Sequence, residues 1–86
     1  MAFTISLSKK VQKDLRKLSK QPVYSSIIAH LRLLAQNPYP LQSKKMVNYQ
    51  EADYLLRIGD YRVLYSVDPV NQVVLIAGVF HRQRGY

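Results

Sequence analysis

The chain has 86 residues, of which 48% are hydrophobic, so it is long enough for one small domain and too apolar for a disordered chain. Thirteen lysines and arginines outweigh five acidic residues, which gives a formal net charge of +8. The absence of cysteine excludes disulfides and thiolate metal sites, and histidines at positions 30 and 81 alone are too few for the usual transition-metal site. We expect no metal and no cofactor.

The charge favours a polyanionic partner, because nucleic acid, an acidic protein or an anionic membrane surface would each be attracted to it. The N-terminal residues lack the apolar core of a signal peptide, and no run approaches membrane-spanning length. We therefore expect a soluble cytoplasmic protein with no membrane attachment. No repeat or linker divides the sequence, so residues 1–86 are expected to form a single domain.

Residues 3–7 predict a short strand, and residues 8–19 predict a helix. The apolar positions recur at helical spacing and are Leu7, Val11, Leu15 and Leu18. A lysine stripe follows another face of this helix and comprises Lys9, Lys13, Lys17 and Lys20. Such a stripe is either a solvated helix face or a surface that meets an anion.

A second helix is predicted from Pro22, which suits a first helical turn, to Asn37, which precedes Pro38. Its apolar face comprises Val23, Ile27, Leu31 and Leu34. The short stretch between the two helices predicts a helical hairpin. Residues 39–50 are then expected to form an irregular basic loop that contains Lys44 and Lys45.

Three segments rich in β-branched and aromatic residues follow, at 54–58, 61–67 and 73–80, and residues 68–71 have turn chemistry. Strands that follow a helical pair in so short a chain predict the α+β class. The expected fold is an N-terminal strand, a two-helix hairpin and a three-stranded antiparallel meander. These strands would form one small sheet with the helices on one face.

The segment YLLRIGDYRVLY predicts a hairpin, because Gly59 and Asp60 fit a two-residue type II′ turn. In that register Arg57 lies opposite Arg62, and opposed residues share a sheet face. One face is suited to the helices and carries Tyr54, Leu56, Ile58, Tyr61, Val63 and Tyr65. The other face carries Leu55, Arg57, Arg62 and Leu64.

Two opposed guanidinium groups repel each other, yet together they are a good receptor for a phosphate. Alternatively, both side chains extend into water, or a carboxylate such as Asp53 or Asp60 neutralises one of them. The terminal sequence FHRQRGY has two readings as well, a solvated tail or a further part of the same site. The few carboxylates and the three separated glycines support neither an acid pair nor a phosphate loop, so the candidate chemistry narrows to Arg, Lys, His and Tyr.

The succession YLLRIGDYRVLYSVD, a short turn, an apolar strand and then HRQRGY resembles the RelE/ParE superfamily of toxins from type II toxin–antitoxin systems. The resemblance is specific over residues 54–86 and is one of element order before them. It implies a RelE-like fold and a small toxin held inactive by a cognate antitoxin protein.

RelE-like members are metal-independent endoribonucleases that cleave mRNA, often on the ribosome, and so inhibit translation. The resemblance implies this function for the chain, with mRNA and the ribosome as partners. Two alternatives stay open. One is a ParE-like toxin that is not a nuclease and inhibits DNA gyrase, and the other is a non-toxic basic RNA-binding module.

Carried over from RelE-like members, the implied catalytic residues are Arg57, Arg62, His81, Arg82 and Tyr86. Lys44 and Lys45 fall in the family's basic loop, which implies RNA binding. Arg84 is expected either to contact an RNA phosphate or to be solvated. One departure is Leu55, where some relatives carry a lysine; if that lysine is a proton-transfer group, Leu55 weakens the catalytic case.

Cleavage by a 2′-hydroxyl needs a base, an acid for the leaving 5′-oxygen and charge stabilisation. The arginines stay protonated, so they fit charge stabilisation and orientation. Neighbouring cations would favour the phenolate of Tyr86, which could act as base or stack on a nucleobase. His81 fits the leaving-group acid or an alternative base.

Overall fold

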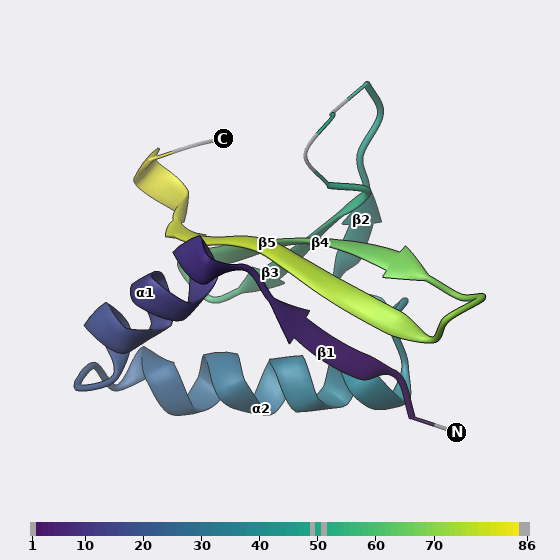
Figure 1. Cartoon of the computed structure of the whole chain (residues 1–86). Coiled ribbons are helices and arrows are strands. Elements are labelled where there is room, and N and C mark those ends of the chain that lie inside the picture. Colours follow the sequence, from purple (N-terminus) through teal and green to yellow (C-terminus); the bar gives the residue numbers. More distant parts are fainter. Residues whose placement is uncertain (1, 49, 51, 85–86) are drawn as a thin grey trace.

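The chain folds as a five-stranded sheet with two helices against one face, and the description covers residues 2–48, 50 and 52–84 of a computed structural model (Figure 1). The elements in chain order are β1 (Thr4–Leu7), α1 (Lys9–Leu18), α2 (Val23–Gln36), β2 (Ser43–Lys45), β3 (Tyr54–Ile58), β4 (Tyr61–Asp68), β5 (Val73–His81) and the 3₁₀ turn η1 (Arg82–Arg84). The strand order is β1-β5-β4-β3-β2; β1 runs parallel to β5, and the other neighbours are antiparallel. The predicted α+β class is confirmed.

The helices form where the apolar periodicity predicts them. The Ser8 side chain caps α1 by accepting a hydrogen bond from the Val11 N–H at 3.2 Å, and Val11 and Leu15 are buried. The four lysines of the stripe are exposed. Proline after Asn37 disfavours further helix, and α2 ends at Gln36. Neither helix in the described part of the chain is long and apolar enough to cross a membrane.

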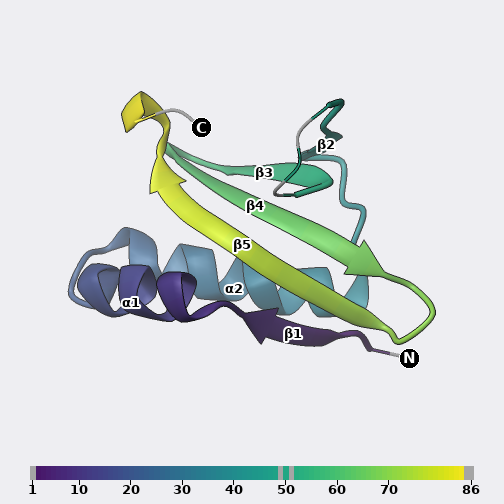
Figure 2. The same cartoon turned by 45° about the horizontal axis from the view of Figure 1, so that its top comes forward.

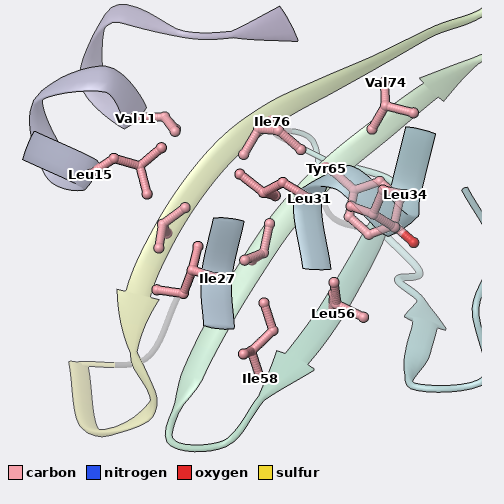
Figure 3. Close-up of a cluster of buried hydrophobic side chains, with 12 residues drawn as sticks. Val11, Leu15, Ile27, Leu31, Leu34, Leu56, Ile58, Tyr65, Val74 and Ile76 are labelled. Atoms are coloured by element: carbon pink, nitrogen blue, oxygen red, sulfur yellow. The ribbon is translucent and has the colours of Figure 1, made fainter. Parts of the chain in front are cut away.

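The main core lies between the two helices and the face of the sheet that they cover, as Figure 3 shows. The strand side chains predicted to face the helices do so: Leu56, Ile58, Val63 and Tyr65 are buried in this core, and Tyr54 and Tyr61 pack against it. Tyr65 is fully buried, and its hydroxyl donates a hydrogen bond to the Pro38 carbonyl at 2.8 Å. That bond ties the segment after α2 to the middle of the sheet.

The prediction of an irregular loop over residues 39–50 was wrong at its centre, because Ser43–Lys45 form strand β2. These residues pair antiparallel with β3, with Lys44 opposite Leu55 and Lys45 opposite Tyr54. The sequence Ser-Lys-Lys has no apolar alternation, so the strand depends on the backbone edge that β3 offers. The sheet therefore has one strand more than the sequence predicted.

A β-bulge in β5 changes which side chains face the helices. Leu64 pairs with Gly78, whereas the next residue, Tyr65, pairs with Ile76, so Ala77 is an extra residue in β5. Ile76 before the bulge and Val79 after it both lie in the main core. Beyond the bulge the alternation is therefore shifted by one residue, and this shift sets the direction of the end of β5.

The face of the sheet that the helices leave uncovered is called here the open face. In Figures 1 and 2 the helices lie on one side of the sheet, and η1 rises on the other side, at the end of β5.

Candidate anion-binding site

The β3–β4 turn forms as predicted and sets the position of two arginines. Gly59 has φ 57°, and Asp60 is not among the residues with positive φ, as a type II′ turn requires. Arg57 pairs with Arg62 across the hairpin. Because directly opposed residues share a face, both side chains leave the sheet on the open face, with Cβ atoms about 5 Å apart.

The two arginine side chains differ in their hydrogen bonds within the protein. The Arg62 Nη1 group donates hydrogen bonds to the carbonyl oxygens of Gly59 at 3.0 Å and Tyr61 at 2.9 Å. Its Nε and Nη2 donors have no acceptor among the described residues, and these two atoms form the edge that binds an anion side-on. Arg57 is exposed and makes no hydrogen bond or ion pair in the described part of the chain. The five N–H donors of Arg57 and the three on Nε and Nη2 of Arg62 are thus available on the same face of the hairpin.

A third guanidinium comes from the end of β5 and is anchored to the same turn. The Arg82 N–H donates a hydrogen bond to the Asp60 carbonyl at 2.8 Å, and the Arg82 Nε lies 3.4 Å from Asp60 Oδ1. Both side chains are more than half exposed, so this ion pair adds little stability. Its main effect is to hold the Arg82 side chain beside the turn that also holds Arg62.

From the sequence, Asp60 was expected to be a turn residue and a possible neutraliser of Arg57 or Arg62. In the structure its carboxylate pairs with Arg82 instead, and its backbone carbonyl fixes the start of η1. The only hint of this contact in the sequence was the predicted turn, since a turn residue lies near the residues that follow the adjacent strand, here Arg82 after β5. The contact between residues 60 and 82 depends on strand pairing, which a local pattern does not reveal.

Beside the arginines, the open face is apolar. Leu55 and Leu64 are buried there in a second cluster with Ala52, and the packed neighbours are Met46, Ala77 and Phe80. Leu55 is 7% exposed. Lys44 lies opposite Leu55 and so belongs to the open face, where it adds an exposed cation.

The remaining predicted site residues lie elsewhere or outside the described residues. Lys45 is exposed and, being opposite Tyr54, belongs to the helix side of the sheet. His81 is opposite Tyr61 and lies on the helix side as well, with the two rings edge to face at 5.2 Å between centroids. Arg84 is the last residue of η1, and Tyr86 lies outside the described residues.

The arrangement can bind and stabilise a phosphate. Arg57, Arg62 and Arg82 supply three permanent positive charges. Among the described residues, Asp60 is the only carboxylate that forms an ion pair, and its partner is Arg82. No three histidine, cysteine or acidic side chains gather as a metal site in the part of the chain that the structure describes. The structure brings together the three arginines and Lys44, and it separates His81 and Lys45 from them.

Several solved structures are similar to this fold over nearly the whole chain. Among solved structures, the RelE–RelB complex of the archaeon Pyrococcus horikoshii contains a chain with 29% identity and a TM-score of 0.82, over 99% of this chain and 100% of that one. The toxin–antitoxin complex RelBE2 of Mycobacterium tuberculosis gives 24% identity and a TM-score of 0.78, over 95% and 100%. A mutant of the Escherichia coli toxin RelE in the free state gives 22% and 0.75, over 99% and 88%. No curated protein sequence matches the chain significantly.

The fold is that of the toxins in these toxin–antitoxin complexes. The sequence profile of the ParE toxin of the type II system parDE matches residues 5–86, nearly the whole chain. The chain belongs to this family, within the RelE/ParE superfamily, and the resemblance found in the sequence is confirmed.

Proposed function

We propose that this toxin is a metal-independent endoribonuclease that cleaves mRNA on the ribosome and so inhibits translation. The observation that carries the proposal is the pairing of Arg57 with Arg62 on the open face. A ribonuclease of this kind must stabilise extra negative charge on the phosphate as the 2′-hydroxyl attacks. Two opposed guanidinium groups, with Arg82 anchored nearby, supply that charge stabilisation where RNA can reach it.

The roles follow from what each group can do. Arg57 is free of intramolecular hydrogen bonds among the described residues, so all its donors can turn to a substrate phosphate. Arg62 is held by its own turn and offers a fixed edge, which favours orientation. Lys44 on the same face is proposed to contact the RNA backbone, together with Lys45 and Arg84.

The proton-transfer roles remain predictions. Tyr86 lies outside the described residues, and we keep it as the proposed base because an arginine cluster would favour its phenolate. His81 lies on the helix side of the sheet, away from Arg57 and Arg62. We therefore propose no proton-transfer role for His81 in this arrangement.

The proposal is tested by primer extension on an mRNA in a reconstituted translation reaction. Arg57→Ala should slow cleavage by at least about tenfold, since one stabilising charge is removed. Arg16→Ala is the matched control, because Arg16 is an exposed arginine of α1 outside the open face. Cleavage by Arg57→Ala at the wild-type rate, or no cleavage by the wild-type chain, would refute the proposal.

A second candidate function is inhibition of DNA gyrase without nuclease activity. Two observations favour it: the family profile that matches is that of a ParE toxin, and Leu55 makes the open face apolar where some relatives carry a lysine. This candidate predicts that the purified chain inhibits supercoiling by gyrase and leaves mRNA intact. A supercoiling assay run beside the cleavage assay separates the two activities.

For either activity we propose a cognate antitoxin protein as partner. The similar chain from Pyrococcus horikoshii is in complex with RelB, and the net charge of +8 here favours an acidic partner segment. Co-expression with the product of the neighbouring reading frame should yield a complex that survives purification and restores growth. Growth inhibition that no neighbouring product relieves would count against this partner.

A further inference from the structure

The arginines of the open face cannot protonate the leaving 5′-oxygen of an RNA. Guanidinium groups do not give up a proton in proteins, so Arg57, Arg62 and Arg82 are limited to binding and charge stabilisation. The Asp60 carboxylate is an acceptor that pairs with Arg82, and His81 lies on the helix side of the sheet. Cleavage by a 2′-hydroxyl still needs a proton for the leaving oxygen. A lysine of the edge strand is placed to supply it.

Lys44 is exposed on the open face, next to the paired arginines. It pairs with Leu55 across β2 and β3, so both side chains leave the sheet on the same face. Arg57 is two residues farther along β3 and is the diagonal neighbour of Lys44, at about 7–8 Å. Leu55 and Met46 belong to the apolar cluster of this face, along which the lysine stem can lie while its ammonium extends to a phosphate.

The Lys44 ammonium is available to a substrate. It forms no hydrogen bond or ion pair with the residues that the structure describes, and Asp53, just before β3, forms no ion pair with it. The next residue, Lys45, is opposite Tyr54 and belongs to the helix side. Two adjacent lysines thus differ in one respect, which is the face of the sheet that each occupies.

Backbone hydrogen bonds at both ends of β2 hold this difference. Before the strand, the Ser43 N–H and hydroxyl both donate to the Pro40 carbonyl, at 2.9 and 2.7 Å. After it, the Met46 N–H donates to the Asp53 carbonyl at 2.8 Å. A shift of one residue would exchange the two faces, and these bonds oppose it. The register therefore keeps Lys44 on the face of the arginines.

We propose that Lys44 is the general acid of the cleavage reaction, an inference that rests on the proposed ribonuclease function. The 2′-oxygen bonds to phosphorus as its proton passes to the proposed base, Tyr86, and the bond from phosphorus to the 5′-oxygen breaks. The Lys44 ammonium gives one proton to that 5′-oxygen. The products are a 2′,3′-cyclic phosphate, a 5′-hydroxyl and a neutral amine. A primary alcohol is a much weaker acid than an ammonium ion, so this transfer is favourable once the bond breaks.

The strand order suits the two proton transfers. In an in-line displacement, the attacking and leaving oxygens are on opposite sides of phosphorus. In the order β5-β4-β3-β2, Arg62 and Arg57 are on the two middle strands, Lys44 is on the β2 side and Arg82 follows β5 (Figure 2). The chain continues from Arg82 to Tyr86. A phosphate bound by the arginine pair thus has the acid on one flank, and the segment that carries the proposed base starts on the other.

The test separates a proton donor from a simple positive charge. The cleaved position is first mapped with the wild-type chain on ribosomes that hold a synthetic mRNA. Lys44→Arg keeps the charge but cannot give up a proton, so it should slow cleavage there by at least about 100-fold. The same mRNA is then made with sulfur in place of the 5′-oxygen at that bond. A thiolate leaves without a proton, so Lys44→Arg should cut this mRNA at the wild-type rate.

Lys45→Arg is the matched control and should cut both mRNAs at the wild-type rate, because Lys45 lies on the helix side. Thermal unfolding of Lys44→Arg should be unchanged, since Lys44 is exposed and has no partner among the described residues. This checks that slow cleavage does not come from a damaged fold.

The outcomes distinguish the role of Lys44 from the ribonuclease function. Equal slowing of Lys44→Arg on both mRNAs overturns the general acid and leaves the ribonuclease function intact. Full activity of Lys44→Arg beside slow cleavage by Lys44→Gln also overturns it, because Lys44 would then act through its charge alone. No cleavage of either mRNA by the wild-type chain refutes the ribonuclease function and the role of Lys44 with it.

Discussion

Arg57 and Arg62 lie directly opposite each other across the β3–β4 hairpin, on the sheet face that neither helix covers. Like charges in this position destabilise a hairpin, and no carboxylate among the described residues pairs with either one. The arrangement thus has an energetic cost within the free protein that a bound phosphate would remove.

Activity and stability should therefore respond in opposite directions when Arg57 is removed. Arg57→Gln should raise the free energy of unfolding by a few tenths of a kcal/mol through relief of repulsion, while RNA cleavage falls. Urea unfolding at low and high salt measures the first effect, which added salt should shrink. A variant that is both less stable and less active would indicate a structural role for Arg57.

The two arginines should also act as a unit on the substrate. If both side chains bind the same phosphate, the double variant Arg57→Ala/Arg62→Ala should lose less cleavage rate than the product of the two single-variant losses. Cleavage rates of the four proteins in this cycle give the coupling directly. Strictly multiplicative losses would mean that the two side chains contact separate phosphates.

Asp60 should act as a positioning residue for Arg82. Asp60→Asn leaves the backbone hydrogen bond from the Arg82 N–H intact but removes the charge partner at 3.4 Å. We expect kcat for RNA cleavage to fall several-fold, while KM stays the same or decreases because a negative charge leaves the site. An increase in KM with kcat unchanged would contradict this role. Asp53→Asn serves as control, because Asp53 is exposed and its carboxylate forms no ion pair or hydrogen bond with the described residues.

Tyr65→Phe should destabilise the fold without touching the open face. The variant leaves the buried Pro38 carbonyl without its 2.8 Å donor, at a cost of about 1–3 kcal/mol. Denaturant unfolding measures the loss, and Tyr39→Phe is the matched control because Tyr39 is 47% exposed. Equal stability of the two variants would show that the Tyr65 hydroxyl bond contributes nothing.

The turn between β4 and β5 should make a small pH-dependent contribution. The Asn71 side chain and backbone N–H, which donate to the Asp68 carboxylate at 2.8 and 3.1 Å, lower the pKa of that carboxyl. Because the folded-state pKa is depressed, the stabilisation is present above the unfolded value of about 3.9 and is lost as pH falls through the folded value. The difference in unfolding midpoint between wild type and Asp68→Ala should shrink below pH of about 4, and a constant difference would contradict this.

The sequence predicted what depends on near neighbours in the chain. The β3–β4 register follows from Gly59 and Asp60, since a two-residue turn leaves one register for the strands it joins. The helices follow from apolar periodicity. Strand β2 was missed because Ser43–Lys45 has no pattern of its own and pairs only because β3 has a free edge.

The position of His81 could not be predicted for a related reason. Plain alternation from the buried residues Val74 and Ile76 would place His81 on the open face, beside the arginines. The extra residue Ala77 at the bulge reverses this, so that Val79 and His81 face the helices. A one-residue irregularity has no clear sequence signal, yet it separates a predicted site residue from its predicted partners.

Every residue placed on the open face comes from the C-terminal half of the chain, whereas α1 and α2 pack against the opposite face (Figure 1). Because strand side chains alternate, Leu55, Arg57, Arg62 and Leu64 can each be exchanged without removing a side chain from the main core. Substitutions that redirect such a toxin from one target to another thus need no compensating change in its helices. The helix-facing side chains of β3 and β4 are kept for the main core, and Arg57 and Arg62 on the other face can change without altering it.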